Sequence, residues 1–288
     1  MPELPEVETI ARGVDRRLRG DRIAHVWFST YREPFKNPSH NQARGLEGRR
    51  ILAVHRTGKH IVFELGEGHG FGLRRRKGGT GSPMAAEAQW IVHLGMTGRL
   101  LVGSPDLPVE AHTHARLALE SGNELRFVDP RRFGRLEFRD LEHGQGFAGP
   151  GTEPLTIDAS DFAALFRGRK TTIKAALLNQ ELLAGVGNIY ADESLFRAGI
   201  RPAKRASRLT AEQLEKLRIA LRNVLKHAIR RGGSSVSDYV DADGERGFFQ
   251  IEHCVYRRTG QPCRVCGTPI RRILIAGRGT HYCPHCQR

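Results

Sequence analysis

EHGQGFAGPGTEP, residues 142–154, separates two parts of the chain that have different hydrophobic patterns. Its glycines and prolines are typical of an interdomain linker. Before it, short β-rich runs separated by turn residues predict a sandwich or barrel over roughly residues 20–140. After it, apolar residues recur at helical spacing. The sequence therefore predicts two domains, residues 1–145 and 146–288, in a chain of mixed α+β class.

The N-terminal part is expected to begin with a helix and continue in strands. Val7, Ile10, Val14 and Leu18 recur at helical spacing within residues 5–19. The runs expected to form strands alternate or are rich in β-formers. These runs are RIAHVWF (22–28), RRILAVHRTGKHIVFEL (49–65), QWIVHLGM (89–96), GRLLVG (98–103), HARLALE (114–120), NELRFVD (123–129) and RLEFRD (135–140).

The C-terminal part is expected to hold four helices. Ser160 is the predicted N-cap of the first, and Thr210 is the predicted N-cap of the last and longest. Gly232 and Gly233 are expected to end that last helix. The four helical segments are SDFAALFRG (160–168), TTIKAALLNQELL (171–183), NIYADESLFRAG (188–199) and TAEQLEKLRIALRNVLKHAIRRGG (210–233). From Phe248 onward the sequence looks β-like.

The composition favours a polyanionic partner. The formal net charge is +15 over 288 residues, which points first to nucleic acid. The chain contains no apolar run long enough to cross a bilayer, and its first ten residues lack the apolar core of a signal peptide. We therefore expect a cytoplasmic protein that associates with the nucleoid through DNA.

Four of the five cysteines form two CxxC pairs near the C-terminus. Cys263, Cys266, Cys283 and Cys286 have the spacing of a closed tetrahedral zinc site, so we expect one structural zinc ion. Residues 263–288 also contain five arginines and no acidic residue, which suits contact with backbone phosphates. Cys254 lies outside this pattern and is expected to be a small buried residue.

Three turns carry residues with two interpretations each. GVGNIYADE (185–193) predicts either an anion site at a helix N-terminus or a close-packed corner. HLGMTG (93–98) and DPRRFG (129–134) place Met96, Arg131 and Phe133 in turns, either as wedges for a base stack or as core residues. Lys59, in RTGKH, precedes a strand and is either functional or merely solvated.

The N-terminus MPELPEVETI also has two interpretations. Proline and glutamate suit the start of a helix. If Met1 is removed, Pro2 becomes a secondary amine that is less basic than lysine and can attack a carbon electrophile. Glu3 would then lie beside it as a proton donor or acceptor.

Taken together, these motifs resemble one family. PELPEVET, GKH, HLGMTG, DPRRFG, IKAALLNQ, GVGNIYADE and the four-cysteine finger follow one another from Pro2 to Cys286 in the order seen in bacterial formamidopyrimidine-DNA glycosylases. The resemblance implies a bifunctional glycosylase and AP lyase of base excision repair that acts on oxidised purines in double-stranded DNA as a monomer. It implies an N-terminal helix and β-sandwich, a helix-two-turn-helix region at about 160–233 and a zinc-finger hairpin at about 250–288.

The resemblance also implies roles for individual residues. Pro2 would attack C1′ to form a Schiff base, Glu3 would protonate the deoxyribose, and Glu6 would support that site. Lys59 and Arg278 would hold phosphates at the lesion and assist β- and δ-elimination. Met96, Arg131 and Phe133 would fill the gap left by the flipped nucleotide. The remaining positions that match DNA contacts are His93, His112, Arg169, Lys174, Asn188 and Tyr256.

Some features depart from the family's usual pattern. Arg169 stands where lysine is usual. The basic insertion within residues 72–88 is longer than usual and is either a surface loop or an additional DNA contact. By contrast, the loop at 233–247 follows the family's pattern and matches the segment that closes over the extruded base.

Two alternatives remain at this point. An endonuclease VIII-type enzyme for oxidised pyrimidines would usually have glycine in place of Leu4. A non-catalytic zinc-ribbon protein would account for the charge and the cysteines but not for the PELPE start.

Overall fold

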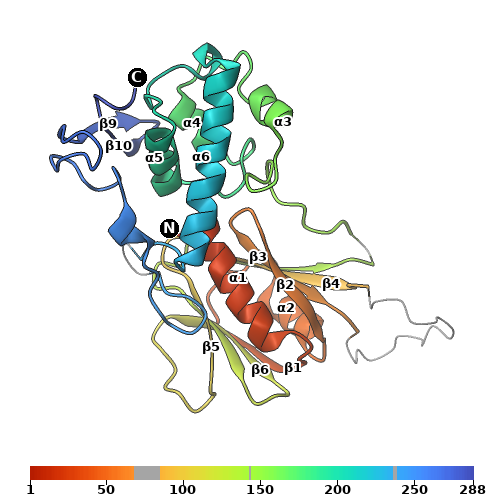
Figure 1. Cartoon of the computed structure of the whole chain (residues 1–288). Coiled ribbons are helices and arrows are strands. Elements are labelled where there is room, and N and C mark those ends of the chain that lie inside the picture. Colours follow the sequence, from red (N-terminus) through yellow and green to blue (C-terminus); the bar gives the residue numbers. More distant parts are fainter. Residues whose placement is uncertain (68–84, 143, 236–238) are drawn as a thin grey trace. The chain divides into compact units, whose positions relative to one another are not determined.

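The computed structural model describes residues 1–67, 85–142, 144–235 and 239–288, which divide into two compact units (Figure 1). The first unit comprises Met1–Pro2, Glu6–Ala148 and Ser237–Arg246; the second comprises Glu3–Pro5, Gly149–Val236 and Gly247–Arg288. Two four-stranded sheets lie in the first unit, and four α-helices and the cysteine cluster lie in the second. The predicted α+β class is therefore confirmed.

The first unit contains two antiparallel sheets of four strands each. One has the order β1 (Ile23–Phe28), β6 (Thr113–Leu119), β7 (Glu124–Val128) and β5 (Arg99–Gly103). The other has the order β2 (Ile51–Thr57), β3 (His60–Leu65), β4 (Ala88–His93) and β8 (Arg135–Asp140). Every run that was predicted to form strands does so, and residues 49–65 form the hairpin β2–β3.

Helix α1 (Leu4–Leu18) shares one hydrophobic core with both sheets of this unit. Val7, Ile10, Val14 and Leu18 are buried in that core, as their helical spacing predicts. The short helix α2 (Ser39–Leu46) was not predicted, because only Gln42 and Leu46 in it are buried and its apolar residues are too few to show a period.

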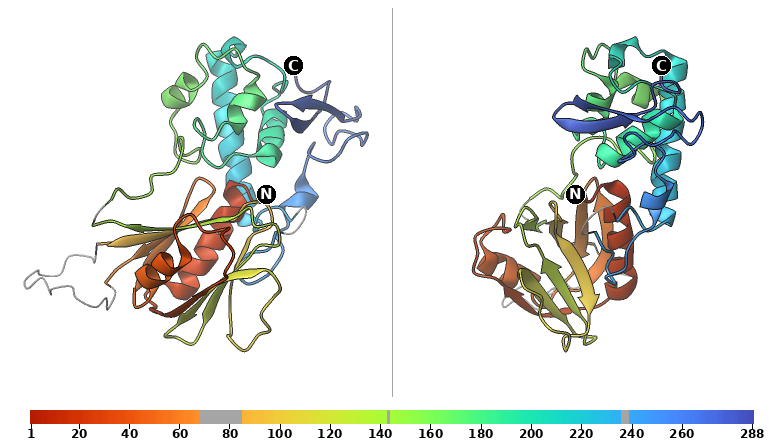
Figure 2. Two further views of the ribbon diagram at one scale, coloured as in Figure 1. Left: turned by 180° about the vertical axis from the view of Figure 1, so that it is seen from behind. Right: turned by 90° about the vertical axis from the view of Figure 1, so that its left-hand side faces the viewer.

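The second unit is built around α6 (Ala211–Arg230), which packs against α5 (Asn188–Arg197) and α3 (Ala159–Ala164) (Figure 2). Helix α4 (Ile173–Leu178) contacts α5, and so does strand β10 of the hairpin β9 (Arg271–Ile275)–β10 (Arg278–Tyr282). Short 3₁₀ turns lie at Ala206–Arg208 and Phe249–Glu252, so the region just after Phe248 is not a strand.

Two helix caps in this unit were predicted, with different outcomes. The Thr210 side chain accepts the Gln213 N–H in a capping box, as expected for α6. The prediction for Ser160 was wrong, since the Asp158 side chain caps α3 by accepting the Asp161 N–H, and Ser160 lies inside the helix. In the described part of the chain, no helix is both long and apolar enough to cross a membrane.

Candidate functional site

Glu3 lies at the N-terminus of α5, within the second unit. Its buried carboxylate accepts the backbone N–H groups of Ile189 at 3.0 Å and Tyr190 at 3.4 Å. The neighbouring Leu4 N–H donates to the Gly185 carbonyl at 3.0 Å. A carboxylate is stabilised at this position, because the first N–H groups of a helix have no partner inside it. The anion at the Gly-rich turn is therefore the chain's own Glu3.

Gly187 makes this contact possible. A Cβ at position 187 would lie 2.3 Å from the Glu3 Cδ, far inside any allowed contact. The φ angle of Gly187 is −129°, which other residues adopt freely, so space rather than backbone conformation requires glycine. The glycine is needed because the carboxylate occupies the place of its side chain.

Lys174 has a different position from the one expected for a DNA contact. Its side chain is 0% exposed, and Nζ lies 2.5 Å from Asp192 Oδ1. The other oxygen, Asp192 Oδ2, accepts the His281 backbone N–H at 2.9 Å. The expected DNA contact of Lys174 is therefore corrected to an internal ion pair, because no atom of a fully buried ammonium is open to a phosphate.

This buried pair is connected to the hairpin that carries Arg278. The Gly279 carbonyl accepts from Lys174 Nζ at 3.3 Å and from Asn188 Nδ2 at 3.0 Å. Arg278 is exposed at the start of β10, directly after a two-residue turn in which Ala276 and Gly277 both have positive φ. Side chains from α4 and α5 thus hold the backbone beside this exposed guanidinium.

Glu193 holds the segment that contains Tyr256. Its buried carboxylate accepts the backbone N–H groups of Cys254, Val255 and Tyr256 at 2.9–3.0 Å. Burial raises the pKa of Glu193, and the three N–H groups oppose that rise by stabilising the anion. Burial likewise raises the pKa of the Tyr256 hydroxyl.

Asp192 and Glu193 were missed as positioning residues from the sequence. The available signal was two adjacent acids in α5, whose residues 189–196 are all buried. A buried carboxylate requires partners, and in this unit those partners are the Arg278 hairpin and the Tyr256 segment.

The four predicted zinc ligands form one cluster. The Sγ atoms of Cys263 and Cys286 are 3.9 Å apart, those of Cys266 and Cys283 are 3.5 Å apart, and all four lie within 4.8 Å of one another. Tetrahedral zinc with Zn–S bonds of about 2.3 Å requires S···S distances of about 3.8 Å. The thiols therefore fit a zinc ion. Cys254 was expected to be a small buried residue; it lies outside the cluster and is only half-buried.

In the first unit, Asp129 joins the two turns that carry the predicted wedges. Its buried carboxylate accepts Thr97 Oγ1 at 2.6 Å, from the first turn, and the Gly134 N–H at 2.7 Å, from the second. A Cβ at Gly95 would lie 2.5 Å from backbone atoms of Phe133 and Gly134. The two turns are therefore in backbone contact, and sequence reasoning did not identify Asp129 as their link.

The side chains on these turns are exposed rather than part of the core. Met96 is 41% exposed and Phe133 is 48% exposed. The Arg131 guanidinium lies 4.6 Å from the centre of the Phe133 ring. His112 belongs to the same region, since its carbonyl accepts the Asp129 N–H and its φ is 64°. An exposed apolar pair beside an arginine is suited to insertion into a base stack.

Lys59 lies in the β2–β3 turn and is largely buried. His93, at the end of β4, is half-buried, and burial together with nearby positive charges lowers its pKa to about 4. It is therefore uncharged at neutral pH.

Glu6 is buried on α1, and its backbone carbonyl accepts from the Tyr239 hydroxyl at 3.5 Å. Pro2 is also buried.

Arg169 lies in the second unit. The exposed Arg169 follows α3, and its Nε donates to the Leu165 carbonyl. Residues 68–84 of the basic insertion and residues 236–238 of the predicted closing loop lie outside the described residues.

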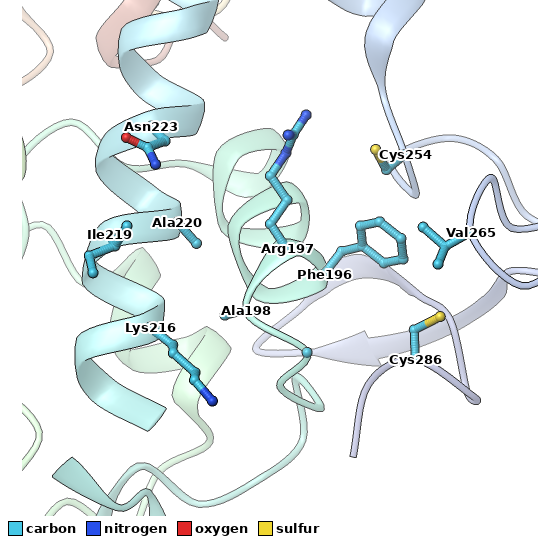
Figure 3. A pocket seen from close by; sticks show the side chains of 11 residues that line it. Phe196, Arg197, Ala198, Lys216, Ile219, Ala220, Asn223, Cys254, Val265 and Cys286 are labelled. Carbon is cyan, nitrogen blue, oxygen red and sulfur yellow. The ribbon is translucent and has the colours of Figure 1, made fainter. Parts of the chain in front are cut away.

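A cavity of about 770 Å³ in the second unit contains almost none of the expected site residues (Figure 3). It lies between α5, α6 and the finger, with Phe196, Ile219 and Val265 in its lining. Of the residues singled out from the sequence, only the ligand Cys286 and the free Cys254 reach it. Cavity size alone therefore does not locate the site.

Comparison with known proteins accounts for nearly the whole chain. Residues 1–136 match the family model of the formamidopyrimidine-DNA glycosylase N-terminal domain, and residues 149–240 match that of the formamidopyrimidine-DNA glycosylase H2TH domain. Residues 260–288 match the zinc finger found in FPG and IleRS.

Relatives resemble the chain over its full length. It is 46% identical to the formamidopyrimidine-DNA glycosylase of Solibacter usitatus and 43% identical to that of Burkholderia cenocepacia, with all of each chain covered. Among solved structures, it is similar to Thermus thermophilus MutM (FPG), at 40% identity and a TM-score of 0.81 over 99% of this chain and 98% of that one. The Lactococcus lactis Fpg complex with DNA containing an abasic site gives 33% identity and a TM-score of 0.84 over 99% of both. The chain belongs to the formamidopyrimidine-DNA glycosylase family.

Proposed function

We propose that Pro2, after removal of Met1, is the nucleophile with which this chain excises damaged bases. The overall reaction follows from the family: the chain is a DNA glycosylase of base excision repair for oxidised purines, and AP lyase activity is known for the family. The assignment of individual residues is our proposal.

In the proposed reaction, the Pro2 nitrogen attacks C1′ of the damaged nucleotide. The C1′–N9 bond breaks, its electron pair leaves with the purine, and the purine takes up a proton. Glu3 takes up the proton that the Pro2 nitrogen loses on attack and passes it to the deoxyribose ring oxygen, so that the ring opens and an iminium forms between Pro2 and C1′. The iminium acidifies the C2′–H bond. Loss of that proton expels the 3′ phosphate, and a second elimination expels the 5′ phosphate.

The observation that carries this proposal is the placement of Glu3. Its carboxylate is held by two N–H groups of α5 and lies next in the chain to Pro2. A proton-transfer group must have a defined position to contribute to catalysis. Glu6, buried one helical turn further along, would support the same end of α1.

DNA recognition is proposed for cationic, polar and apolar side chains of both units. Lys59 and Arg278 would bind phosphates at the lesion, and His93, His112, Arg169, Asn188 and Tyr256 would contact the strand. Met96, Arg131 and Phe133 would occupy the gap in the duplex, because a glycosylase must extrude the nucleotide to reach C1′. The proposed substrate is double-stranded DNA with an oxidised purine or an abasic site, in line with the lesion DNA bound by the Lactococcus lactis relative.

A single structural zinc ion is proposed for the four cysteines of the finger. With four thiolates the ion has no open position, so it would stabilise the finger without activating water. The hairpin with Arg278 lies between the two ligand pairs, and the ion would thus keep that arginine at a defined place.

The test is borohydride trapping on DNA that contains 8-oxoguanine opposite cytosine. Wild-type protein should give a covalent adduct, and Pro2→Gly should lose at least about 100-fold in excision because the secondary amine is lost. Binding to DNA with an abasic-site analogue should stay within about threefold, since Pro2 is not expected to provide binding energy.

Two results would contradict the proposal. One is full trapping by the Pro2→Gly protein; the other is a loss of binding that parallels the loss of excision. Intact-mass measurement on the same sample checks that Met1 has been removed. A parallel substrate with thymine glycol tests the endonuclease VIII-type alternative.

A further inference from the structure

A second, smaller cavity in the C-terminal unit is lined by three arginines. Its volume is about 380 Å³, and its lining includes Arg257, Arg258 and Arg264 beside Tyr256 and Gln261. None of the described residues that line it is acidic. The lining therefore concentrates positive charge, which favours an anionic ligand.

Arg258 forms the fixed base of this cavity. Its guanidinium donates to Gln261 Oε1 at 3.0 Å, to the Cys254 carbonyl at 2.7 Å and to the Pro262 carbonyl at 2.9 Å. These bonds use three of its five donors and leave its full charge in place. Arg264 is anchored similarly, through one bond to the Ile251 carbonyl at 2.9 Å.

Arg257 occupies a backbone conformation that favours glycine. It is the third residue of a tight turn closed by the Arg258 N–H and the Val255 carbonyl at 3.1 Å, and its φ is 57°. Side chains other than glycine, asparagine and aspartate are strained at positive φ. Retention of an arginine there indicates that its side chain has a use that offsets the strain.

The charges of Arg257 and Arg264 both act on His253. His253 is buried against the wall, and the charges of Arg264 and Arg257 add to the effect of burial in lowering its pKa to about 4. His253 is thus neutral at pH 7 and contributes no further charge.

Tyr256 connects this cavity to the proposed DNA surface. Its backbone N–H is bound to Glu193, so the turn that carries Arg257 starts from a fixed point. A ligand in the cavity would therefore lie beside a residue already proposed to contact the strand.

We propose that Arg257, Arg258 and Arg264 form a phosphate-binding pocket that takes a backbone phosphate of bound DNA, away from the reacting sugar. Arg257 would bind the phosphate from the turn, and Arg258 and Arg264 would supply a fixed positive field. This inference rests on the proposed function, because it assumes that lesion DNA lies along Tyr256.

The test compares Arg257→Gln with Arg230→Gln, which removes one exposed charge from the last turn of α6 outside the pocket. Affinity for a duplex with an abasic-site analogue is measured by fluorescence anisotropy over a range of salt concentrations. Arg257→Gln should weaken binding about tenfold. It should also reduce the slope of log K against log salt by about 0.9, the value for one phosphate contact. Arg230→Gln should match the wild type.

Replacing single phosphates by neutral methylphosphonates then identifies the source of the phosphate. At one position, the replacement should weaken the wild type but have no further effect on Arg257→Gln. Titration of inorganic phosphate without DNA, followed by thermal shift, supplies the other arm. Arg257-dependent stabilisation by free phosphate, with no sensitive position in the duplex, would overturn a DNA subsite.

Equal behaviour of the two variants would also overturn the proposal. Arg257→Gly guards against misfolding, since glycine suits the turn and should lower affinity without lowering the melting temperature. Borohydride trapping by the wild type separates this result from the first proposal: a trapped adduct with no role for Arg257 removes only the pocket.

Discussion

At the scale of single residues, the structure explains why glycine stands at position 187. Its missing side chain leaves the space that the Glu3 carboxylate fills, and both ends of this contact are buried. The Glu3 carboxylate thus fits in the space left by the missing side chain of Gly187 and is held there by two backbone N–H groups.

Gly187→Ala should therefore reduce excision by about 100-fold, because a displacement of about 1 Å in a catalytic group can cost that much. Single-turnover excision of 8-oxoguanine measures the effect. The matched control is Gly146→Ala, where the new Cβ would come no closer than 3.5 Å to any neighbour. Equal activity of the two variants would show that the position of Glu3 is unimportant.

At the scale of elements, the turns at residues 93–98 and 129–134, which carry the proposed wedges, are held together as one rigid unit. Asp129 accepts donors from both turns, and the turns touch through the backbone at Gly95. Met96 and Phe133 would otherwise sit on two separate turns, each joining strands of different sheets and each free to move alone.

Asp129→Asn should lower the free energy of unfolding by about 1–3 kcal/mol, because a buried N–H or hydroxyl loses a charged acceptor. It should also weaken binding to lesion DNA. Chemical denaturation and anisotropy measure the two effects, with the exposed Asp106→Asn as control. Unchanged stability would mean that the turns hold their shape without this carboxylate.

At the scale of the whole molecule, zinc is expected to determine whether the finger is ordered. Cys283→Ser should abolish stoichiometric zinc and weaken DNA binding, because structural zinc supplies much of the folding free energy of so small a hairpin. Cys254→Ser, outside the cluster, should keep one zinc ion per chain. Zinc content by atomic absorption and DNA affinity check both, and zinc loss in both variants would contradict the assignment.

Stability should also depend on acidity through His253. Its pKa is about 4 in the folded chain against an ordinary value of 6.5, so the unfolded chain binds the proton more readily. The contribution is complete above about pH 6.5 and is lost as the pH falls towards 4, by on the order of 3 kcal/mol.

Denaturation at about pH 7 and about pH 4.5 tests this directly. His253→Gln should show a shallower loss of stability than the wild type, whereas the exposed His40→Gln should not. Parallel curves for all three proteins would exclude His253 as the source.

Much of the fold could be predicted from the sequence because its signals are local. The period of Val7, Ile10 and Val14 defines α1, and the change of period after the linker separates strands from helices. The pair of CxxC motifs predicts the thiol cluster, since each pair is close in sequence and chelation allows few alternatives. The domain boundary after residue 145 and the roles of the site residues stay predictions.

The sequence by itself thus determined the class of the fold, the cysteine cluster and the family. Only the tertiary structure decided what surrounds the individual charges. Glu3 meets Ile189 across 186 residues, and Lys174 is paired internally with Asp192 rather than exposed. The reason is physical: periodicity and spacing report the geometry of one segment, whereas burial and ion pairing depend on segments distant in the chain.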